Sequence, residues 1–400
     1  MKKVHYLLSC LFILFFMVSC GTGNKETFSV EKAKENLDFA ISQYEKMYAT
    51  IDDLATYPRN IKENGETHYV KPGDWTSGFY PGSLWYLYEY SNNEELKSMA
   101  EKLNAGLEVL KTNTGTHDLG FMMYCSFGNG LRLTENSGYK DILVEGAYSL
   151  ATRFDSVVGC IKSWDWGGRR NWQFPVIIDN MMNLEFLFWA AQTTGDDSFY
   201  KIATTHANTT MKNHFRDDYS SFHVVDYDTI TGEIRWKGTH QGYADESAWA
   251  RGQAWGLYGY TMCYRETKDE TYLNQAVNIA NYILDHPNLP EDFIPYWDFF
   301  APDIPDTERD ASAGAVIASA LIELGQYVEE PAKAKFLGSA EKILASLSSP
   351  AYRAELGANN DFILMHSVGH KPGNSEIDTP LNYADYYYIE ALMRYIDLNE

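Results

Sequence analysis

The sequence is short of cysteine and of positive charge, and both shortages exclude classes of protein. Five of its 400 residues are cysteine. Beyond the first 20 residues there remain Cys125, Cys160 and Cys263, an odd and scattered set that offers neither a disulfide framework nor a CxxC metal site. Lys and Arg number 33 against 55 Asp and Glu, a formal net charge of −22. Nucleic acids and anionic membrane surfaces are therefore not expected partners, because both require a cationic surface.

The sequence also lacks the short signatures of several enzyme classes. No GxSxG, phosphate-loop or dinucleotide-binding motif stands in a strand–turn–helix context. His366 and His370 have HxxxH spacing, but Gly369 and Pro372 break the helix that would put both on one face. The stretch DYDTITG (226–232) is not an EF-hand loop, because its glycine falls one position late. The residues therefore predict no metal site.

The longest apolar run lies at the N-terminus and predicts export. Residues 1–19 combine two lysines, an apolar run and small residues, as in a secretory signal peptide that is too short to span a membrane. SCG (19–21) resembles a bacterial lipobox, with Met17 where leucine is usual. We expect Cys20 to be lipidated and 20–27 to be a tether, so that a lipid anchors the protein facing the periplasm. Cell-surface exposure, or simple cleavage to a free periplasmic protein, is the alternative.

The remaining chain, 28–400, alternates two kinds of helical segment. Six are amphipathic, with apolar residues at i, i+3, i+4 and i+7 and charges on the other face. Six are apolar or aromatic nearly all round, which is typical of helices buried on every side. The amphipathic segments begin near 28 and lie at 94–112, 139–154, 197–215, 270–286 and 331–347, and the apolar ones begin at 74, 118, 179, 247, 310 and 382.

This alternation predicts an all-α fold, an (α/α)6 barrel of six helical hairpins in a closed toroid. No Pro/Gly/Ser-rich linker divides the chain, so 28–400 is expected to be one domain rather than two bundles. The inner helices of such a ring run one way, and their N-termini, with free N–H groups, gather at one mouth where an anion can bind. FHVVDYDTITGEIRWKG (222–238) alternates about a turn and predicts a small β-hairpin near that mouth.

Asp118 and Asp179 stand at the starts of two inner helices, one hairpin apart. Aspartate is a common N-cap, and capping alone would account for either residue. Asp179 follows the apolar run FPVII (174–178), so we expect a partly dehydrated carboxyl with a raised pKa, suited to a general acid. Two carboxylates side by side at the mouth are typical of acid/base catalysis on sugars. An aromatic content of 15% also suits sugar binding.

Four stretches resemble the unsaturated glucuronyl hydrolases, glycoside hydrolase family 88. They are TGTHDLGFMMY (114–124), IIDNMMNLEFLFWA (177–190), RDDYSSFHVVDYD (216–228) and GTHQGYADESAWARGQAWGLYGY (238–260). The likeness runs through nearly the whole mature chain, and the last stretch is its most specific part. The resemblance implies an (α/α)6 barrel that removes the 4,5-unsaturated uronic acid left at the non-reducing end by polysaccharide lyases. The implied substrates are above all glycosaminoglycan disaccharides, and no metal or organic cofactor is implied.

The resemblance also implies roles for single residues. Asp179 is the general acid/base that protonates C4 of the enol ether before water adds to C5. Asp118 is the second essential aspartate, which orients substrate hydroxyls and raises the pKa of Asp179 by its like charge. The side chains implied to line the sugar subsites are His117, His223, Gln241, Arg251, Trp255, Trp75 and one of Trp164 or Trp166, since SWDWGG (163–168) allows two alignments. The residue pattern alone predicts that His223 is a surface residue of a strand, and that Trp75 and Trp255 belong to the barrel core.

The stretch 238–260 has its own expected geometry. Arg251 and Trp255, one helical turn apart, are expected to place a cation above an aromatic platform, with Gln241 beside it. Asp245 and Glu246 are expected in the first turn of that helix, where acidic residues favour the dipole.

The sequence also makes predictions for the segments 365–387 and 309–310. The polar, turn-rich loop 365–387 is expected to bring Ser367, His370 and Lys371 to the leaving sugar or a sulfate, although its spacing departs from the Ser/Lys pattern of some family members. Arg309-Asp310 reads as a local ion pair and helix start.

Two alternatives to the interpretation as a glucuronyl hydrolase remain. One is an unsaturated rhamnogalacturonyl hydrolase, with the same barrel and chemistry on pectin fragments. The other is a non-catalytic glycan-binding lipoprotein, which would need no pair of aspartates at helix starts.

Overall fold

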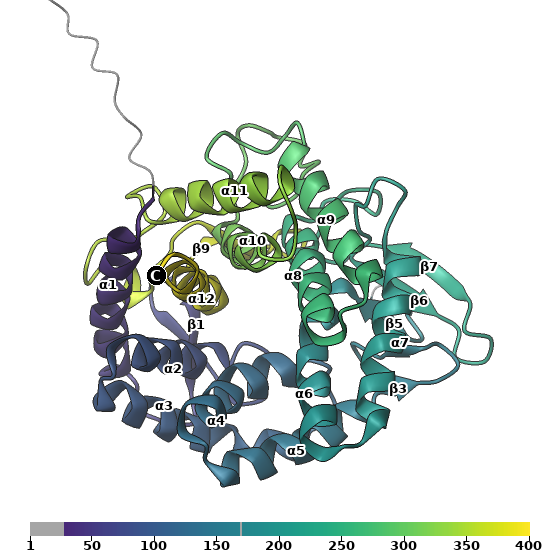
Figure 1. Ribbon diagram of the computed structural model, residues 1–400, viewed down its shortest axis with the longest axis horizontal. Coiled ribbons are helices and arrows are strands. Elements are labelled where there is room, and N and C mark those ends of the chain that lie inside the picture. Colours follow the sequence, from purple (N-terminus) through teal and green to yellow (C-terminus); the bar gives the residue numbers. More distant parts are fainter. Residues whose placement is uncertain (1–27, 169) are drawn as a thin grey trace, which may run out of the picture.

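The computed structural model describes residues 28–168 and 170–400. The predicted signal peptide, Cys20 and the tether 20–27 lie outside the described residues. The helices form two concentric layers around a central axis (Figure 1). The outer layer contains α1 (Val30–Tyr48), α3 (Glu94–Leu107), α5 (Ser137–Ala151), α7 (Asp197–His214), α9 (Glu270–Asp285) and α11 (Ala332–Leu347). The inner layer contains α2 (Phe79–Ser91), α4 (Asn129–Thr134), α6 (Leu184–Thr194), α8 (Ala250–Thr267), α10 (Ala311–Leu324) and α12 (Asn382–Asn399).

This arrangement is the predicted (α/α)6 barrel, and the layers follow the apolar pattern. Every residue of α10 is buried, as is α8 from Ala250 to Cys263. The outer helix α9 instead buries one face only. The ring closes where α12 packs on α1 and α2. In the described part of the chain, no helix is both long and apolar enough to cross a membrane.

The two helical layers begin differently. Most outer helices start at an Asn or Asp whose side chain caps the first turn, as Asn93 does for α3 and Asp196 for α7. The inner helices α2, α8 and α12 begin without a side-chain cap. Their first N–H groups are therefore not satisfied by a capping side chain, which suits a site for an anion.

Two inner helices are entered through irregular turns that bring their starts close together. The π-helical segment η2 (Gly120–Gly128) leads into α4, and the 3-10 segment η3 (Ile178–Asn183) leads into α6. The backbone N–H of Phe121 donates to Asn183 Oδ1 at 3.1 Å. A Cβ at Gly120 would lie 2.6 Å from that oxygen, so only glycine allows this approach. π-helical turns often occur at functional sites.

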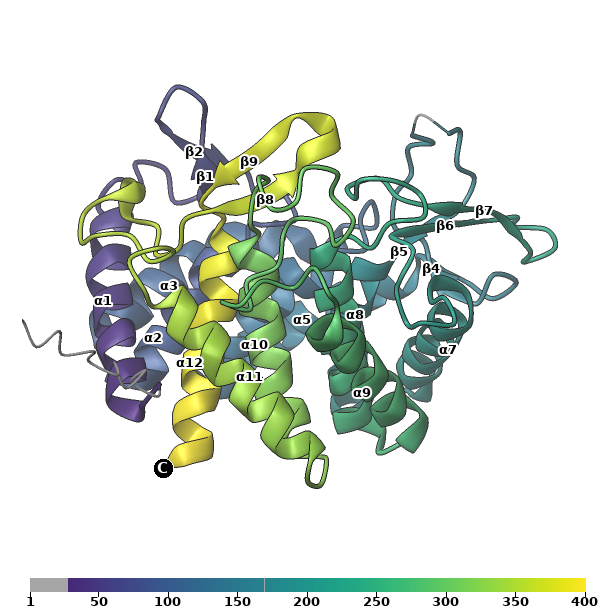
Figure 2. The same cartoon turned by 90° about the horizontal axis from the view of Figure 1, so that it is seen from above.

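Small sheets gather at the end of the barrel where the inner helices start (Figure 2). We call this end the mouth. The strands are β1 (Tyr57–Ile61) with β2 (Thr67–Val70), β3 (Phe154–Asp155) with β4 (Cys160–Ile161), β8 (Ser367–His370) with β9 (Ser375–Thr379), and the three-stranded sheet of β5 (Pro175–Ile177), β6 (Val224–Tyr227) and β7 (Ile234–Gly238).

The predicted hairpin is present and is larger than expected. Strands β6 and β7 pair antiparallel with Val224 opposite Gly238. Strand β5 adds to the other edge of β6, with Ile177 opposite Val224. This third strand places Ile178, the residue after β5, next to His223, the residue before β6.

Candidate active site

Asp179 and His223 meet at the edge of the three-stranded sheet. Both are almost fully buried. The backbone N–H of Ile178 donates to the carbonyl of His223 at 3.0 Å, which fixes the register. His223 Nε2 then lies 3.4 Å from Asp179 Oδ2. The alternating pattern around 223 thus gives a buried histidine at the site, not a surface strand residue.

The surroundings of His223 fix its tautomer. Its Nδ1 accepts two backbone N–H groups, from His240 and Gln241, each at 3.1 Å. A nitrogen that accepts from N–H groups carries no proton, so the ring proton is on Nε2, which faces Asp179. The stretch 238–260 therefore orients the histidine through its backbone.

The pKa of Asp179 departs from the sequence-based expectation. Burial raises the pKa of this carboxyl, as expected, but the contact with His223 and the charge of Arg251 outweigh burial and hold the pKa below its ordinary value. In the unliganded site Asp179 therefore favours the ionised form. The predicted raised pKa is wrong for this state, because the sequence does not show which polar groups surround the residue.

Asp118 has the opposite shift. Its Oδ2 accepts from Thr116 Oγ1 at 2.9 Å, and its Oδ1 lies 3.2 Å from His117 Nε2. Burial raises the pKa of Asp118, and the negative charge of Asp179 adds to the rise, while His117 and Thr116 oppose it. The two carboxyls thus influence each other at the mouth with separated pKa values. The order is the reverse of the expected one, since Asp118 has the raised pKa.

Neither aspartate caps a helix. The N-cap residues of η2 and η3 are Leu119 and Ile177, and neither helix start has a side-chain cap. By contrast, Asp310 does cap α10, because its Oδ1 accepts from Ser312 N at 3.1 Å. The capping interpretation therefore does not explain Asp118 or Asp179.

Buried polar atoms without a hydrogen-bond partner gather around this pair. Among the described residues they include Asp179 Oδ2, His223 Nε2, both ring nitrogens of His117, Arg251 Nε and the hydroxyl of Tyr383. Buried polar groups in proteins normally have partners. A ligand rich in hydroxyl and carboxylate groups can supply them.

A cluster of tryptophans borders His223. Trp164 stacks on Trp166 at 5.2 Å between ring centroids and lies edge-on to His223 at 6.2 Å. Trp166 is 49% exposed and Trp164 half-buried, so Trp164 is the inner ring and Trp166 covers its outer side. Both candidate tryptophans are therefore part of one stack. Trp172, which sequence reasoning missed, stacks on Trp164 at 5.6 Å and lies 5.7 Å from Trp166, so the three rings form one cluster.

Trp75 forms part of the aromatic floor of the mouth. It is half-buried and lies 4.9 Å from Tyr383 and 5.5 Å from Phe121. Asp74 beside it is held by Arg59 at 2.7 Å, and Arg59 also binds Glu376 of β9. This ion-pair bridge between β1, the segment before α2 and β9 was not apparent from the sequence, because Glu376 is more than 300 residues from both Arg59 and Asp74.

Arg251 is buried, but its environment differs from the prediction. Its Nη1 lies 2.9 Å from Asp310 Oδ2 and also contacts the carbonyl of Val368, while Nη2 donates to the carbonyl of Gly369 at 2.7 Å. Gln241 Nε2 donates to the same Gly369 carbonyl at 3.0 Å, so Gln241 does lie beside Arg251. Only Nε of the guanidinium stays without a partner.

The predicted pairing of Arg251 with Trp255 is wrong. The guanidinium lies over Trp249, 4.5 Å from the ring centroid, and 5.2 Å from that of Tyr383. Trp255 is fully buried between Phe121 and Tyr387. The side chain of residue 251 turns toward the preceding turn and the neighbouring helix, which one-turn spacing does not reveal.

Two expectations about charged residues near the mouth also need correction, one about an ion pair and one about the start of a helix. Arg309 binds Asp292 at 2.9 Å and not Asp310, although Asp310 does start a helix. Asp245 lies ahead of α8, which begins at Ala250, and its carboxylate accepts from Thr239 N at 3.1 Å and from Arg170 at 2.7 Å. Glu246 also precedes the helix.

The loop 365–387 reaches the mouth as β8 and β9, where Ser367 and Lys371 have surroundings that the sequence did not predict. Ser367 is fully buried. Lys371 Nζ contacts the carboxylate of Glu308 and lies 3.2 Å from Thr307 Oγ1, so an acid already matches its charge. His370 Nε2 lies 3.0 Å from the carbonyl of His240, which places it nearest the His223 side of the mouth.

Known proteins resemble this chain along nearly its whole length. It is 44% identical over 400 residues to an unsaturated glucuronyl hydrolase of Formosa agariphila, and the alignment covers 98% of each chain. It is 33% identical over 370 residues to an unsaturated chondroitin disaccharide hydrolase of Streptococcus agalactiae, covering 91% of each. No family model matches the chain.

Solved structures agree with these relatives. A crystal structure of an unsaturated glucuronyl hydrolase specific for heparin matches with a TM-score of 0.90 and 49% identity, covering 93% of this chain and 98% of that one. A mutant of the Streptococcus agalactiae unsaturated glucuronyl hydrolase complexed with dGlcA-GalNAc6S matches with a TM-score of 0.80 and 30% identity, covering 93% of each chain.

Proposed function

The chain belongs to the unsaturated glucuronyl hydrolases, and from that premise we propose that it releases the 4,5-unsaturated uronic acid from glycosaminoglycan disaccharides made by polysaccharide lyases. The observation that carries the proposal is the buried pair Asp118 and Asp179, with His223 Nε2 3.4 Å from Asp179 and no capping role for either aspartate. The relatives are named as hydrolases, which favours catalysis over binding alone.

We rank heparin-derived disaccharides first among the substrates. The support is the 49% identity to a structure described as specific for heparin, against 33% to a hydrolase named for chondroitin disaccharides. The contact of Lys371 with Glu308 means that this lysine would bind a sulfate only in competition with an internal carboxylate.

The proposed reaction begins with protonation of the alkene. Asp179 gives its proton to C4, and the positive charge that forms at C5 is shared with the ring oxygen. Because Asp179 is ionised by preference in the free site, the substrate has to raise its pKa. The bound substrate excludes water from the site, and its carboxylate at C5 adds a negative charge near Asp179. Both effects favour the protonated form of Asp179.

Water then adds to C5 and completes the hydrolysis. Asp179, now a carboxylate, takes a proton from that water, which leaves a hemiketal at C5. Cleavage of the bond between C5 and the ring oxygen gives a ketone at C5 and a hemiacetal at C1. The hemiacetal collapses to an aldehyde and releases the second sugar with its hydroxyl restored. His223 holds Asp179 in place, and Asp118 with His117 is positioned to bind the substrate hydroxyls.

The substrate carboxylate needs a positive environment in a protein of net charge −22. The uncapped starts of α2, α8 and α12 supply N–H groups and positive dipole ends at the mouth. The unpartnered Nε of Arg251 adds a charged donor.

The test follows the ultraviolet absorbance of the conjugated alkene in unsaturated disaccharides from heparin, chondroitin, hyaluronan and pectin. We expect the absorbance to fall fastest with a heparin disaccharide and Asp179→Asn to lower kcat by about 10²-fold or more, the range for loss of a general acid. Loss of absorbance with pectin fragments alone would favour the rhamnogalacturonyl alternative. Near-normal turnover by Asp179→Asn would exclude Asp179 as the acid.

We also propose that the protein is an exported lipoprotein tethered through Cys20 and facing the periplasm. The support is the sequence pattern of residues 1–19 and the lipobox-like SCG (19–21). Metabolic labelling with a fatty acid is expected to mark the wild type and not Cys20→Ser. Labelling of both variants, or of neither, would contradict the proposal.

A further inference from the structure

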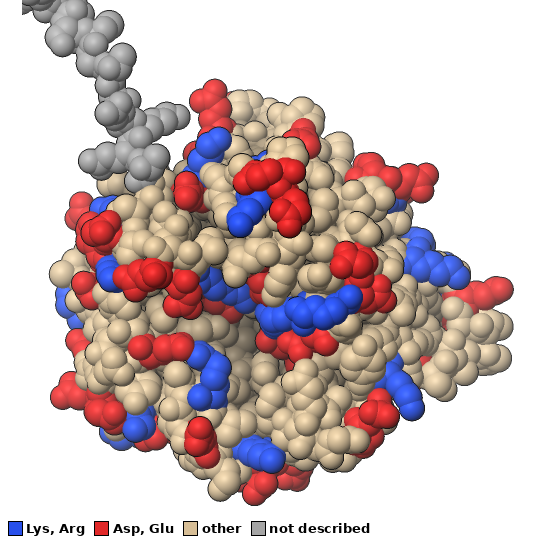
Figure 3. Space-filling model, in the orientation of Figure 1, with Lys and Arg blue, Asp and Glu red and all other residues tan. Residues whose placement is uncertain are grey.

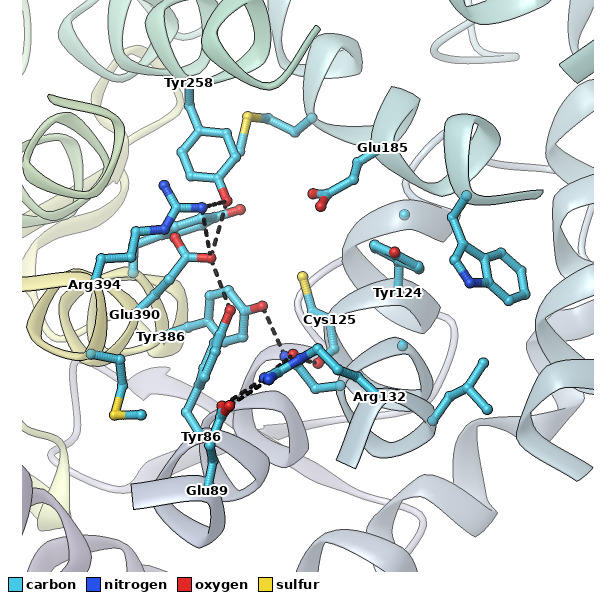
Figure 4. A pocket seen from close by; sticks show the side chains of 18 of the residues that line it. Tyr86, Glu89, Tyr124, Cys125, Arg132, Glu185, Tyr258, Tyr386, Glu390 and Arg394 are labelled. Carbon is cyan, nitrogen blue, oxygen red and sulfur yellow. Dashed lines mark hydrogen bonds and ion pairs between the residues drawn. The ribbon is translucent and has the colours of Figure 1, made fainter. Parts of the chain in front are cut away.

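A cavity lies between the inner helices at the end of the barrel opposite the mouth, and we call it the lower cavity (Figure 4). Its volume is about 440 Å³, within the range of small-molecule sites. All of its walls come from the inner layer, from α2, η2, α4, η3, α6, α8 and α12. The face of the molecule at this end is hollowed near its centre, with acidic and basic side chains around the hollow (Figure 3).

An aromatic layer lies between this cavity and the catalytic end. The buried ring of Trp255 packs against Phe121 at 5.3 Å and against Tyr387 at 5.4 Å. Tyr387 lines the lower cavity, whereas Phe121 also contacts Trp75 of the mouth. Asp118, Asp179 and His223 do not line the lower cavity, so the sugar chemistry at the mouth does not account for it.

The charges around the lower cavity do not balance. Arg265 binds Glu185 at 2.5 Å, Glu266 at 3.0 Å and Glu323 at 2.9 Å. Arg394 binds the other oxygen of Glu323 at 2.9 Å and lies 3.6 Å from Glu390. Four carboxylates thus share two guanidinium groups, a net charge of −2 when all are ionised. The nearby pair of Arg132 and Glu89 is internally neutral and does not change this excess.

The excess charge is largely withdrawn from water. The side chains of Glu323 and Glu390 are 9% and 6% exposed. Burial raises the pKa of Glu185, and the charges of Glu266 and Glu323 add to the rise against the pull of Arg265. A buried excess of negative charge is costly unless a proton or a cation compensates it.

The cavity also presents one phenol group, that of Tyr387, without an internal hydrogen-bond partner among the described residues. Tyr387 is 3% exposed and lines the cavity, yet its hydroxyl makes no hydrogen bond to another described residue. Tyr86 and Tyr258 instead donate to Glu390 Oε1 at 2.9 and 3.0 Å. Glu185 reaches toward the open space between Tyr258 and Tyr124 in Figure 4. A ligand there would meet a carboxylate, a free phenol and aromatic ring faces.

This combination selects one class of cation. Among the described residues no group of three or more His, Cys, Asp or Glu side chains is placed to hold a metal ion. A primary ammonium needs fewer carboxylates, because its N–H groups also donate to phenol oxygens and its charge is attracted to aromatic faces. Hydroxyl groups on the same molecule would satisfy the hydroxyl of Tyr387.

We propose that the lower cavity binds a small hydroxylated primary ammonium of the size of an amino sugar, with its ammonium at Glu185 and a hydroxyl at Tyr387. The site is independent of the hydrolytic reaction and of its substrate. It is also distinct from the mouth, where the substrate's carboxylate requires positive groups.

The test measures binding of D-glucosamine to the full-length protein by calorimetry at neutral pH. We expect saturable binding, which Glu185→Gln weakens by about tenfold or more and Tyr387→Phe weakens severalfold, as loss of a charged and of a neutral hydrogen bond predicts. Glu145→Gln, on the exposed face of α5, and Trp164→Ala, at the mouth, are expected to bind as the wild type does.

Three outcomes would overturn the proposal. The first is no binding of D-glucosamine at millimolar concentrations, and the second is equal binding of uncharged N-acetylglucosamine. The third is binding that depends on Trp164 and not on Glu185, because the amine would then occupy the mouth. Tyr387→Phe removes one oxygen only, so it keeps the test valid if Glu185→Gln does not fold.

Discussion

The pKa values of the two aspartates at the candidate site are shifted in opposite directions because their nearest polar neighbours differ. Both carboxyls are buried, and burial raises the pKa of each. Asp179 has His223 and the charge of Arg251 close by, which outweigh burial, whereas Asp118 has the charge of Asp179 itself as an added unfavourable neighbour. A proton that enters the free site therefore favours Asp118.

This asymmetry predicts different pH profiles for the free and the bound enzyme. A general acid must be protonated, so activity is lost as the pH rises through its pKa. The parameter kcat/KM reports the free enzyme, where the pKa of Asp179 is low, and kcat reports the complex, where the substrate raises it. We expect the descending limb of kcat at higher pH than that of kcat/KM, measured by alkene absorbance.

The same profiles test the assignment of the acid. Asp118→Asn removes a negative neighbour, so both descending limbs should move to lower pH, while the exposed variant Asp217→Asn should leave them in place. Coincident limbs in the wild type would mean that the substrate does not change the pKa of Asp179.

At the scale of elements, the mouth is held by ties between segments distant in the sequence. Arg251 on α8 binds Asp310 at the start of α10 and the carbonyls of β8. Arg59 on β1 binds Asp74 ahead of α2 and Glu376 on β9. Each tie fixes a loop over the inner helix starts, which suits a site whose geometry must be rigid before substrate arrives.

The buried tie predicts a large effect on stability. The side chains of Arg251 and Asp310 are 1% and 0% exposed, so Asp310→Asn leaves a buried charge without its partner. We expect the free energy of unfolding to fall by about 3–5 kcal/mol in urea denaturation. The control is Asp245→Asn, whose half-exposed pair with Arg170 should contribute about 0–1 kcal/mol. An equal loss of unfolding free energy in the two variants would show that the buried pair contributes no more to stability than the half-exposed pair.

At the scale of the whole molecule, one closed ring contains every residue of the proposed site. The closure joins the two ends of the described chain, because Tyr395 on α12 donates to the carbonyl of Phe28 at 2.9 Å. Asp118 and Asp179 lie where η2 and η3 begin, and the lower cavity is lined by other residues of the same inner layer. The described ring, residues 28–400 without 169, therefore contains the whole proposed catalytic site.

This closure predicts that the first 27 residues can be removed without loss of catalysis. A variant that begins at Phe28 behind an initiating Met should keep kcat/KM within about twofold, since a change of 0.4 kcal/mol would already double or halve it. It should also appear in the soluble fraction, whereas the full-length protein is expected with the membranes. A large loss of kcat/KM despite a native melting curve would show that the N-terminal segment takes part in the site.

The sequence by itself determined the fold, and it predicted Asp118 and Asp179 as the acids of the site. Whether a helix is buried on one side or on all sides shows in the spacing of its own apolar residues, so the sequence reveals the six apolar and six amphipathic segments. The stretches around Asp118, Asp179 and 238–260 carry the resemblance to the family. The β-hairpin at 222–238 could also be predicted from the sequence, because strand alternation and turn residues are local features.

Only the tertiary structure decided how the site residues face one another. It turned Arg251 away from Trp255 and toward Asp310, and it gave the raised pKa to Asp118 rather than Asp179. It also brought together Arg265, Glu185 and Glu390, whose joint charge imbalance no single segment shows. The physical reason is that pKa values and ion pairs depend on the few ångströms around a group, and those neighbours come from helices tens to hundreds of residues apart.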